Sequence, residues 1–416
     1  MEKINASIIT IGDELLIGQV VDTNSAWIGK RLLENGIWVS HKFSVGDQYE
    51  DIWHTLDIAA KESQVIIITG GLGPTADDIT KPLLCSYFEG KMIEDKDTLD
   101  HITHLFQHVF KRSMPLLESN RRQAEVPDVC TVLKNEIGTA PGMLFEKNGK
   151  YFFSLPGVPY EMQILMQNQV LPFLQIHFKL PPIAYRTLLT FGIGESLLAE
   201  KIKDFEASLP HEIKLAYLPN FGMLRLRLTA QGVSTEILES AFDKLKELTK
   251  EWLVVPSDIT MQEVVAHLFF QNKKTLATAE SCTGGYIAHL LTAIPNASEF
   301  FKGSTVAYSN YIKSKVLNVK SETLEKVGAV SEETVREMVS GTLAIMNTDY
   351  ALAVSGIMGP GGGTKEKPIG TVWIAVGNND KIVSKIIHVR FDRERNIHLT
   401  AIQALNFLRE FILEKL

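Results

Sequence analysis

Short apolar runs alternate with segments of helical periodicity along the first 175 residues of the chain. The runs at 7–12, 38–45 and 65–69 predict strands, and the first and last of them consist mostly of Ile, Val and Thr. The segments 24–34 and 49–61 carry apolar residues at helical spacing and predict helices. Strands that alternate with helices indicate a parallel α/β sheet, in which ligands bind beyond the carboxyl ends of the strands.

Residues 176–256 follow a different order, βαββα. The predicted elements are a strand at 185–191, a helix at 196–206, strands near 214–218 and at 224–228, and a helix at 235–252. This order predicts a small α+β domain of the split βαβ or KH-like kind, preceded by a linker at Pro181-Pro182. The Gly192–Glu195 loop lacks basic flanks and ends in a carboxylate, which disfavours RNA binding because phosphodiesters are anionic. We interpret this domain as a structural connector that contributes to a dimer interface.

Residues 257–416 contain three apolar strands that each end in a polar loop. The strands are expected at 275–279, 304–308 and 350–355, followed by strands at 371–376 and 382–389 and a helix at 395–411. Parallel strands place their carboxyl ends at one edge of a sheet. We therefore expect the three loops to meet in a single crevice of an α/β sandwich.

The loop after the first of these strands carries a candidate nucleophile. Ser281 lies at the bend of a strand–turn–helix, where its hydroxyl neighbours backbone amides that could stabilise an oxyanion. Lys313, in the first turn of the helix after the second strand, could accept the Ser281 proton if burial depresses its pKa. The loops contain no histidine, which argues against a Ser-His-Asp triad, and Cys282 is a rival nucleophile. The alternatives are a Ser281 that only caps a helix and an ordinary solvated Lys313.

Two glycine-rich loops suit phosphate groups. One is the segment 356–363 after the third C-terminal strand, with Arg393 at a helix start as a further partner for an anion. The other is the segment 70–80, in which glycine amides could approach a phosphate and Asp77 with Asp78 could hold a divalent cation. For this second loop, an Asp-capped helix after a flexible turn explains the same residues.

Bulk composition narrows the class of protein. A chain of 416 residues suggests two or three domains, and its net charge of −7 disfavours nucleic-acid binding. No apolar run reaches the roughly 18 residues that span a bilayer, so we expect no membrane association. The N-terminus lacks the features of a signal peptide, and three cysteines without paired spacing fit a reducing cytoplasm. A cytoplasmic location is therefore expected.

The C-terminal motifs resemble the signature of the nicotinamide mononucleotide deamidases. The matching segments are 279–285, 307–310 with Lys313, 355–360, and 370–373. The resemblance implies Ser281 as the nucleophile and Lys313 as its base, with no cofactor. It also implies substrate contacts at Glu280, Thr283, Gly284, Gly285, Tyr308, Asn310, Ser355, Gly356, Gly359 and Arg393. Met358 stands where alanine is common in that family.

The N-terminal motifs resemble those of the molybdopterin-binding fold, and the whole chain resembles the CinA family. The matching segments are 70–80, 135–142 and 155–159. The resemblance implies an ADP-ribose pyrophosphatase that uses a divalent metal of the Mg or Co type, with K⁺ as a further ion. The implied phosphate positions are Gly70, Gly71, Gly73 and Thr75, and the implied metal positions are Asp13, Asp77 and Asp78.

The leading hypothesis is a homodimeric enzyme of pyridine-nucleotide salvage with three domains, at 1–175, 176–256 and 257–416. Its ligands would be nicotinamide mononucleotide in the last domain and ADP-ribose in the first. A second hypothesis keeps the deamidase but makes the first domain a nucleotide or pterin binder without hydrolysis. A third is a non-enzymatic accessory protein of DNA uptake or repair, which the acidic charge balance disfavours.

Overall fold

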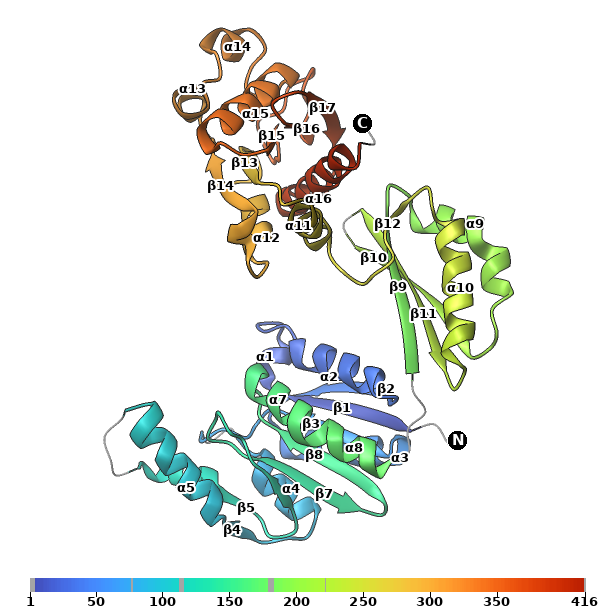
Figure 1. The fold of residues 1–416 in the computed structure, drawn as a ribbon. Coiled ribbons are helices and arrows are strands. Elements are labelled where there is room, and N and C mark those ends of the chain that lie inside the picture. Colours follow the sequence, from blue (N-terminus) through green and yellow to red (C-terminus); the bar gives the residue numbers. More distant parts are fainter. Residues whose placement is uncertain (1–3, 76–77, 112–115, 179–182, 221, 415–416) are drawn as a thin grey trace. The chain divides into compact units, whose positions relative to one another are not determined.

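The computed structural model describes residues 4–75, 78–111, 116–178, 183–220 and 222–414 (Figure 1). The chain divides into two compact units, Met1–Ala184 with Ala230–Ser234, and Tyr185–Thr229 with Thr235–Leu416. The linker predicted at Pro181-Pro182 lies outside the described residues. Within those residues, no helix combines the length and the apolar character that crossing a membrane requires.

The N-terminal unit is built on a six-stranded sheet in the order β2-β1-β3-β8-β7-β6. The strands are β1 (Asn5–Ile11), β2 (Trp38–Val45), β3 (Val65–Thr69), β6 (Thr131–Leu133), β7 (Gly142–Lys147) and β8 (Lys150–Leu155). The four strands β2, β1, β3 and β8 are parallel, which confirms the predicted α/β class. Strand β7 pairs antiparallel with β8, and β6 pairs antiparallel with β7. A small separate sheet pairs β4 (Met92–Glu94) with β5 (Glu125–Pro127).

Helices cover both faces of this sheet. They are α1 (Asp13–Leu16), α2 (Thr23–Glu34), α3 (Tyr49–Glu62), α4 (Thr80–Tyr87), α7 (Pro159–Leu165) and α8 (Leu171–His177). The helix α5 (Lys96–His104) packs in a small separate core and contacts α6 (Glu118–Arg121). Successive residues of β1 serve opposite layers, because Ile8 packs in a core with α2 and α7 while Ile9 packs in a core with α3 and α4. Burial on both faces explains why the parallel strands are continuous apolar runs in the sequence.

The middle segment forms a four-stranded sheet in the order β10-β11-β9-β12. Its elements are β9 (Ile183–Phe191), α9 (Glu195–Ala207), β10 (Ile213–Asn220), β11 (Met223–Gln231), α10 (Thr235–Leu248) and β12 (Leu253–Val255). The predicted βαββα order is confirmed, and Leu224, Leu226 and Leu228 of β11 are buried as their alternation indicates. The sequence did not predict β12, a short strand that pairs antiparallel with β9.

The C-terminal sheet has the order β14-β13-β15-β16-β17. Its strands are β13 (Leu276–Glu280), β14 (Phe301–Val306), β15 (Tyr350–Gly356), β16 (Thr371–Gly377) and β17 (Ile382–His388). The first three are parallel, as predicted. Strand β16 pairs antiparallel with β15, and β17 pairs antiparallel with β16. The loops that follow β13, β14 and β15 therefore emerge at the same edge.

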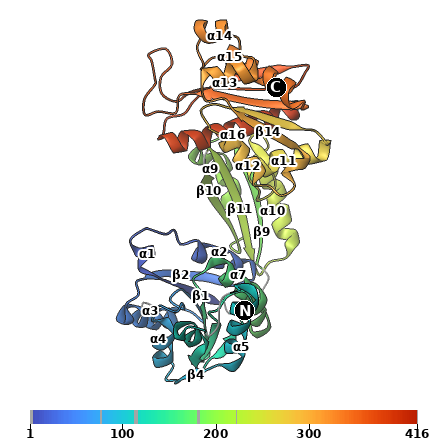
Figure 2. The ribbon, with the colours of Figure 1, turned by 90° about the vertical axis from the view of Figure 1, so that its left-hand side faces the viewer.

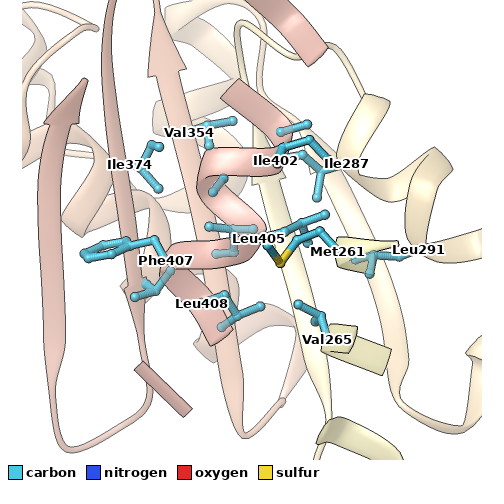
Figure 3. Packing of buried hydrophobic residues seen from close by; sticks show 14 of the residues in the cluster. Met261, Val265, Ile287, Leu291, Val354, Ile374, Ile402, Leu405, Phe407 and Leu408 are labelled. Carbon is cyan, nitrogen blue, oxygen red and sulfur yellow. The ribbon is translucent and has the colours of Figure 1, made fainter. Parts of the chain in front are cut away.

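Helices also cover both faces of the C-terminal sheet. They are α11 (Met261–Asn272), α12 (Tyr286–Thr292), α13 (Asn310–Leu317), α14 (Ser321–Lys326), α15 (Glu332–Met346) and α16 (Arg393–Ile412). Figure 2 shows α15 and α16 on opposite sides of the sheet, and the cores agree, since Val354 packs with α16 and Ala353 packs with α15. Figure 3 shows Leu405 of α16 beside Met261 of α11 in the first of these cores. The three loops are thus held on a scaffold packed from both sides.

Candidate active site

Ser281 directly follows β13 and is held by the sheet. Its backbone N–H donates to Val354 O at 3.0 Å, so the pairing with β15 continues one residue beyond the strand. The chain then turns into α12 through Gly284 and Gly285, whose φ angles of 62° and 98° favour glycine. The Ser281 side chain is largely buried, and its hydroxyl lies at the carboxyl end of the strand.

Lys313 reaches the same point from α13. The helix begins after Ser309, whose hydroxyl accepts the Ile312 N–H at 3.3 Å as an N-cap. The Lys313 side chain is only 1% exposed, and its Nζ lies 3.0 Å from Ser281 Oγ and 2.7 Å from Ala307 O. Within the described chain no carboxylate forms an ion pair with it. Burial lowers the pKa of Lys313, so the amine loses its proton more readily than a solvated lysine does.

A cavity of about 290 Å³ opens beside this pair. It is lined by Ser281, Cys282, Tyr308, Lys313, Ala329, Val330, Ser355, Gly356, Ile357, Met358, Gly359, Gly361, Gly362 and Arg393. Seven of the residues proposed from the sequence are therefore brought together, from all three loops and the start of α16. The lining does not include Glu280, Thr283, Gly284, Gly285 or Asn310. Ala329 and Val330 gave no sequence signal, because they are small apolar residues in an unremarkable loop.

Arg393 connects two walls of the cavity. Its Nη1 donates to Gly359 O at 2.7 Å, and its Nη2 donates to the Tyr308 hydroxyl at 3.0 Å. A guanidinium has five N–H donors, so these two contacts fix its plane and leave others for an anion. Arg393 gives the lining a positive charge, and the lining contains no Asp or Glu.

The glycine-rich wall needs small residues at defined positions. A Cβ on Gly356 would come within 2.7 Å of Val372 Cγ2 and 2.9 Å of Thr371 O. Gly359 has a φ of 82°. Ser355 donates its hydroxyl proton to Ala329 O at 2.7 Å, which joins this wall to the segment 327–330. Gly356 therefore allows close packing of this wall, and Gly359 allows its turn.

Asn396 was missed by sequence reasoning although it fastens this wall to α16. It is fully buried, and its Nδ2 donates to Met358 O at 3.1 Å and Phe391 O at 2.8 Å. Its Oδ1 accepts the Phe391 N–H at 3.0 Å. The available signal was a polar residue on the apolar side of the helix that starts at Arg393.

The rival nucleophile Cys282 has the wrong surroundings for a thiolate. It packs in the core with α16, and burial raises its pKa to about 12. A thiol with that pKa remains protonated near neutral pH and is a poor nucleophile. Ser281, with a buried amine at hydrogen-bond distance, has the better chemistry.

The amides near Ser281 differ from the sequence expectation. The Gly284 N–H donates to Ser281 O at 3.2 Å, and the Gly285 N–H donates to the Glu280 carboxylate at 3.1 Å. The amides of Cys282 and Thr283, by contrast, have no acceptor on any other residue that the structure describes. The donors available to an oxyanion therefore lie in the turn directly after Ser281 and not at the start of α12.

In the N-terminal unit, the predicted phosphate loop follows β3. A Cβ on Gly70 would lie 2.2 Å from Ile11 O, and one on Gly71 would lie 2.1 Å from Thr80 Oγ1. These glycines are required by close packing of the loop. A cavity of about 140 Å³ lies at the carboxyl ends of β1 and β3, and Gly70 lines it, whereas Gly71, Gly73 and Thr75 do not.

The two predicted metal ligands that the structure describes, Asp13 and Asp78, belong to no cluster that could hold a metal ion. Asp78 accepts the Gly73 N–H at 2.7 Å and the Thr75 N–H at 2.9 Å, so it stabilises its own loop as a cap. Asp13 accepts the Asp47 N–H at 3.2 Å, and Asp77 lies outside the described residues. Over the ranges that the structure describes, no three His, Cys, Asp or Glu side chains could hold a metal ion together. The described carboxylates therefore do not fit a preformed metal site.

Three family models match the chain. Residues 7–176 match a probable molybdopterin binding domain, residues 185–253 match the damage-inducible protein CinA KH domain, and residues 258–412 match the CinA C-terminal domain. The fold is accordingly mixed α/β, with a molybdopterin-binding-like sheet, a KH-like middle domain and a C-terminal sheet domain.

Curated relatives match over nearly the full length. A CinA-like protein of Cytophaga hutchinsonii is 44% identical over 99% of both chains. A CinA-like protein of Flavobacterium psychrophilum is 42% identical over 98% of this chain and 99% of its own. Among solved structures, a competence-damaged protein (CinA) superfamily member from Klebsiella pneumoniae is 34% identical, covering 38% of this chain and 99% of its own, with a TM-score of 0.36.

Proposed function

The chain belongs to the CinA family, and we propose that its C-terminal domain hydrolyses the carboxamide of nicotinamide mononucleotide to nicotinate mononucleotide and ammonia. The observation that carries this proposal is the buried Lys313 amine 3.0 Å from Ser281 Oγ. A hydroxyl becomes an effective nucleophile only when a base removes its proton, and a neutral lysine is such a base.

In the first half of the reaction, Ser281 Oγ attacks the carboxamide carbon while its proton passes to Lys313 Nζ. The amides of Cys282 and Thr283 donate to the oxyanion of the tetrahedral intermediate. The carbon–nitrogen bond then breaks, the leaving nitrogen takes the proton from Lys313, and ammonia departs. An ester between Ser281 and the nicotinoyl group remains.

In the second half, water attacks the ester carbonyl. Lys313 accepts a proton from the water and returns it to Ser281 Oγ as the ester bond breaks. The free carboxylic acid leaves as nicotinate mononucleotide. Each proton is transferred between Ser281, Lys313, water and substrate, so the scheme requires no metal or organic cofactor.

The charge of the cavity supports an anionic nucleotide as the substrate. Its lining carries the Arg393 guanidinium and no carboxylate. The glycine-rich segment 356–363 and the free donors of Arg393 suit the phosphate group. A volume of about 290 Å³ lies near the lower end of the range of ~300–1,000 Å³ for small-molecule pockets, which favours a mononucleotide.

For the N-terminal unit we propose the narrower role of a nucleotide or pterin binder. The cavity at the carboxyl ends of β1 and β3 supports ligand binding, and the engagement of Asp78 within its own loop favours binding over metal-dependent cleavage. Release of AMP from ADP-ribose with Mg²⁺ or Co²⁺, with and without K⁺, tests this choice. Turnover there would favour the pyrophosphatase that the family resemblance implies.

The deamidase proposal is tested by ammonia release from nicotinamide mononucleotide with and without EDTA. Turnover should survive EDTA and disappear in Ser281→Ala and Lys313→Ala. A wild-type protein that releases no ammonia would overturn the proposal and favour a binding or accessory role. Light scattering of the same samples tests the proposed homodimer.

A further inference from the structure

Glu280 is a fully buried carboxylate directly before the nucleophile, yet it does not line the cavity. Its Oε2 accepts the N–H groups of Gly285 at 3.1 Å and Ile287 at 3.0 Å. The Thr283 hydroxyl donates to the same oxygen at 2.7 Å. Its Oε1 accepts the Ala288 N–H at 2.8 Å. Glu280 is therefore bound from both oxygens by the turn after Ser281 and by the first turn of α12.

These contacts determine which backbone N–H groups near Ser281 are free to donate to an oxyanion. The first N–H groups of a helix have no partner within the helix, and in α12 Glu280 accepts those of Ile287 and Ala288 while Thr283 O accepts that of Tyr286. The turn is also fixed at its other end, because the Ser281 N–H donates to Val354 O. With both ends fixed, the Cys282 and Thr283 amides have no acceptor on another described residue, in a turn whose Ser281 and Cys282 line the cavity.

We infer that Glu280 is a positioning residue, which holds the turn 281–285 so that Ser281 Oγ faces Lys313 and the Cys282 and Thr283 amides face the oxyanion. This inference rests on the proposed amide hydrolysis. Glu280 touches no reacting atom, and its role is to fix geometry. The N–H donors and the hydroxyl that it binds stabilise its carboxylate in the buried site.

Glutamine cannot reproduce this arrangement although it has the same shape. Its carbonyl oxygen can replace one carboxylate oxygen, but its NH₂ group then faces an N–H donor. In Glu280→Gln, either the Ala288 N–H or the three donors bound to Oε2 would lose their acceptor in a buried site. The turn should shift to relieve this conflict.

The test compares Glu280→Gln with Asp349→Asn in the full chain. Asp349 is a matched control, because it binds the Thr275 N–H at 2.9 Å and the Thr275 hydroxyl at 2.8 Å at the opposite end of the same strand. We expect kcat of Glu280→Gln to fall about 10²-fold, the effect of misplacing a reacting group by about 1 Å. KM and the pH midpoint of kcat/KM should stay at their wild-type values, and Asp349→Asn should lose thermal stability and keep its kcat.

A Glu280→Gln protein with wild-type kcat, or one whose kcat falls no further than that of Asp349→Asn, overturns the inference. If Glu280→Gln does not fold, Thr283→Val, which removes only the hydroxyl donor to Glu280, must lower kcat without raising KM. Labelling of Ser281 by a small fluorophosphonate, followed by mass spectrometry, separates the two proposals. If wild-type Ser281 is labelled but the protein releases no ammonia, the nucleophile is active and only the proposed substrate is wrong. If wild type and Glu280→Gln are labelled at equal rates, Glu280 does not position Ser281.

Discussion

Lys313 Nζ lies 2.7 Å from the carbonyl oxygen of Ala307, a residue at the end of the strand that precedes its own helix. A neutral amine has two N–H donors and one lone pair. Donation to Ala307 O orients the amine, so that its lone pair can face Ser281 Oγ at 3.0 Å. The main chain between β14 and α13 thereby orients the base that α13 carries, without a carboxylate as intermediary.

Replacing Lys313 by methionine should abolish activity and leave the protein at least as stable. Loss of a general base lowers kcat by about 10²–10⁴-fold. Because burial depresses the pKa of Lys313 below its ordinary value of 10.5, the unfolded chain binds more protons than the folded chain between the lowered pKa and 10.5. The buried amine thus costs stability at neutral pH, and the cost shrinks as pH rises toward 10.5.

The measurements are ammonia release and thermal unfolding at pH 7 for Lys313→Met, with Lys315→Met as the control. Lys315 is exposed on the same helix, so its replacement should leave kcat unchanged. A Lys313→Met protein that retains turnover would contradict the assignment of the base.

The rate should rise with pH. A protonated Lys313 cannot accept the Ser281 proton, so kcat/KM should increase through the pKa of Lys313 and level off above it. That inflection should lie below 10.5, because burial lowers this pKa. A profile of kcat/KM between pH 5.5 and 10 measures it, and a flat profile would show that no such base acts.

Replacing Arg393 by alanine should weaken substrate binding more than it slows the chemistry. The change removes a charge-assisted donor, worth about 1.5–3 kcal/mol, which corresponds to a rise in KM of roughly 10–100-fold. Arg393→Lys should not restore KM, because one ammonium cannot copy the fork that bonds both Gly359 O and the Tyr308 hydroxyl. Arg390→Ala, at an exposed arginine outside the cavity lining, is the control.

Gly356→Ala should destabilise the C-terminal domain. The new methyl group would lie 2.7 Å from Val372 Cγ2 and 2.9 Å from Thr371 O, and overpacking of this kind costs about 1–3 kcal/mol. Gly361→Ala in the same loop has nothing within 4 Å of its Cβ and should leave stability unchanged. Urea unfolding of both variants provides the comparison, and equal midpoints would contradict the packing argument.

Cys282→Ala should retain turnover and lose some stability. The thiol packs in the core and its pKa is raised to about 12, so it stays protonated near neutral pH and is a poor nucleophile. Wild-type Cys282 should accordingly resist iodoacetamide at pH 7.5 under native conditions. Loss of ammonia release in Cys282→Ala, with the fold intact by circular dichroism, would reopen the case for a thiol nucleophile.

The sequence by itself determined the strands and the loops that follow them. Runs such as 65–69 are apolar because parallel strands are buried on both faces, and the bend at Ser281 was marked by Gly284 and Gly285. These are local features, set by periodicity and by the freedom of glycine, and they can be read from one segment at a time.

Only the tertiary structure decided which side chains meet and what each one does. Lys313 lies 32 residues from Ser281 in the chain, and its burial depends on the packing of α13 against the sheet. Glu280 looked like a substrate contact beside the nucleophile, but strand alternation turns it toward α12, where it takes the amides expected to bind an oxyanion. Distance, burial and the use of each N–H depend on contacts between distant segments, and a pattern along the chain does not contain them.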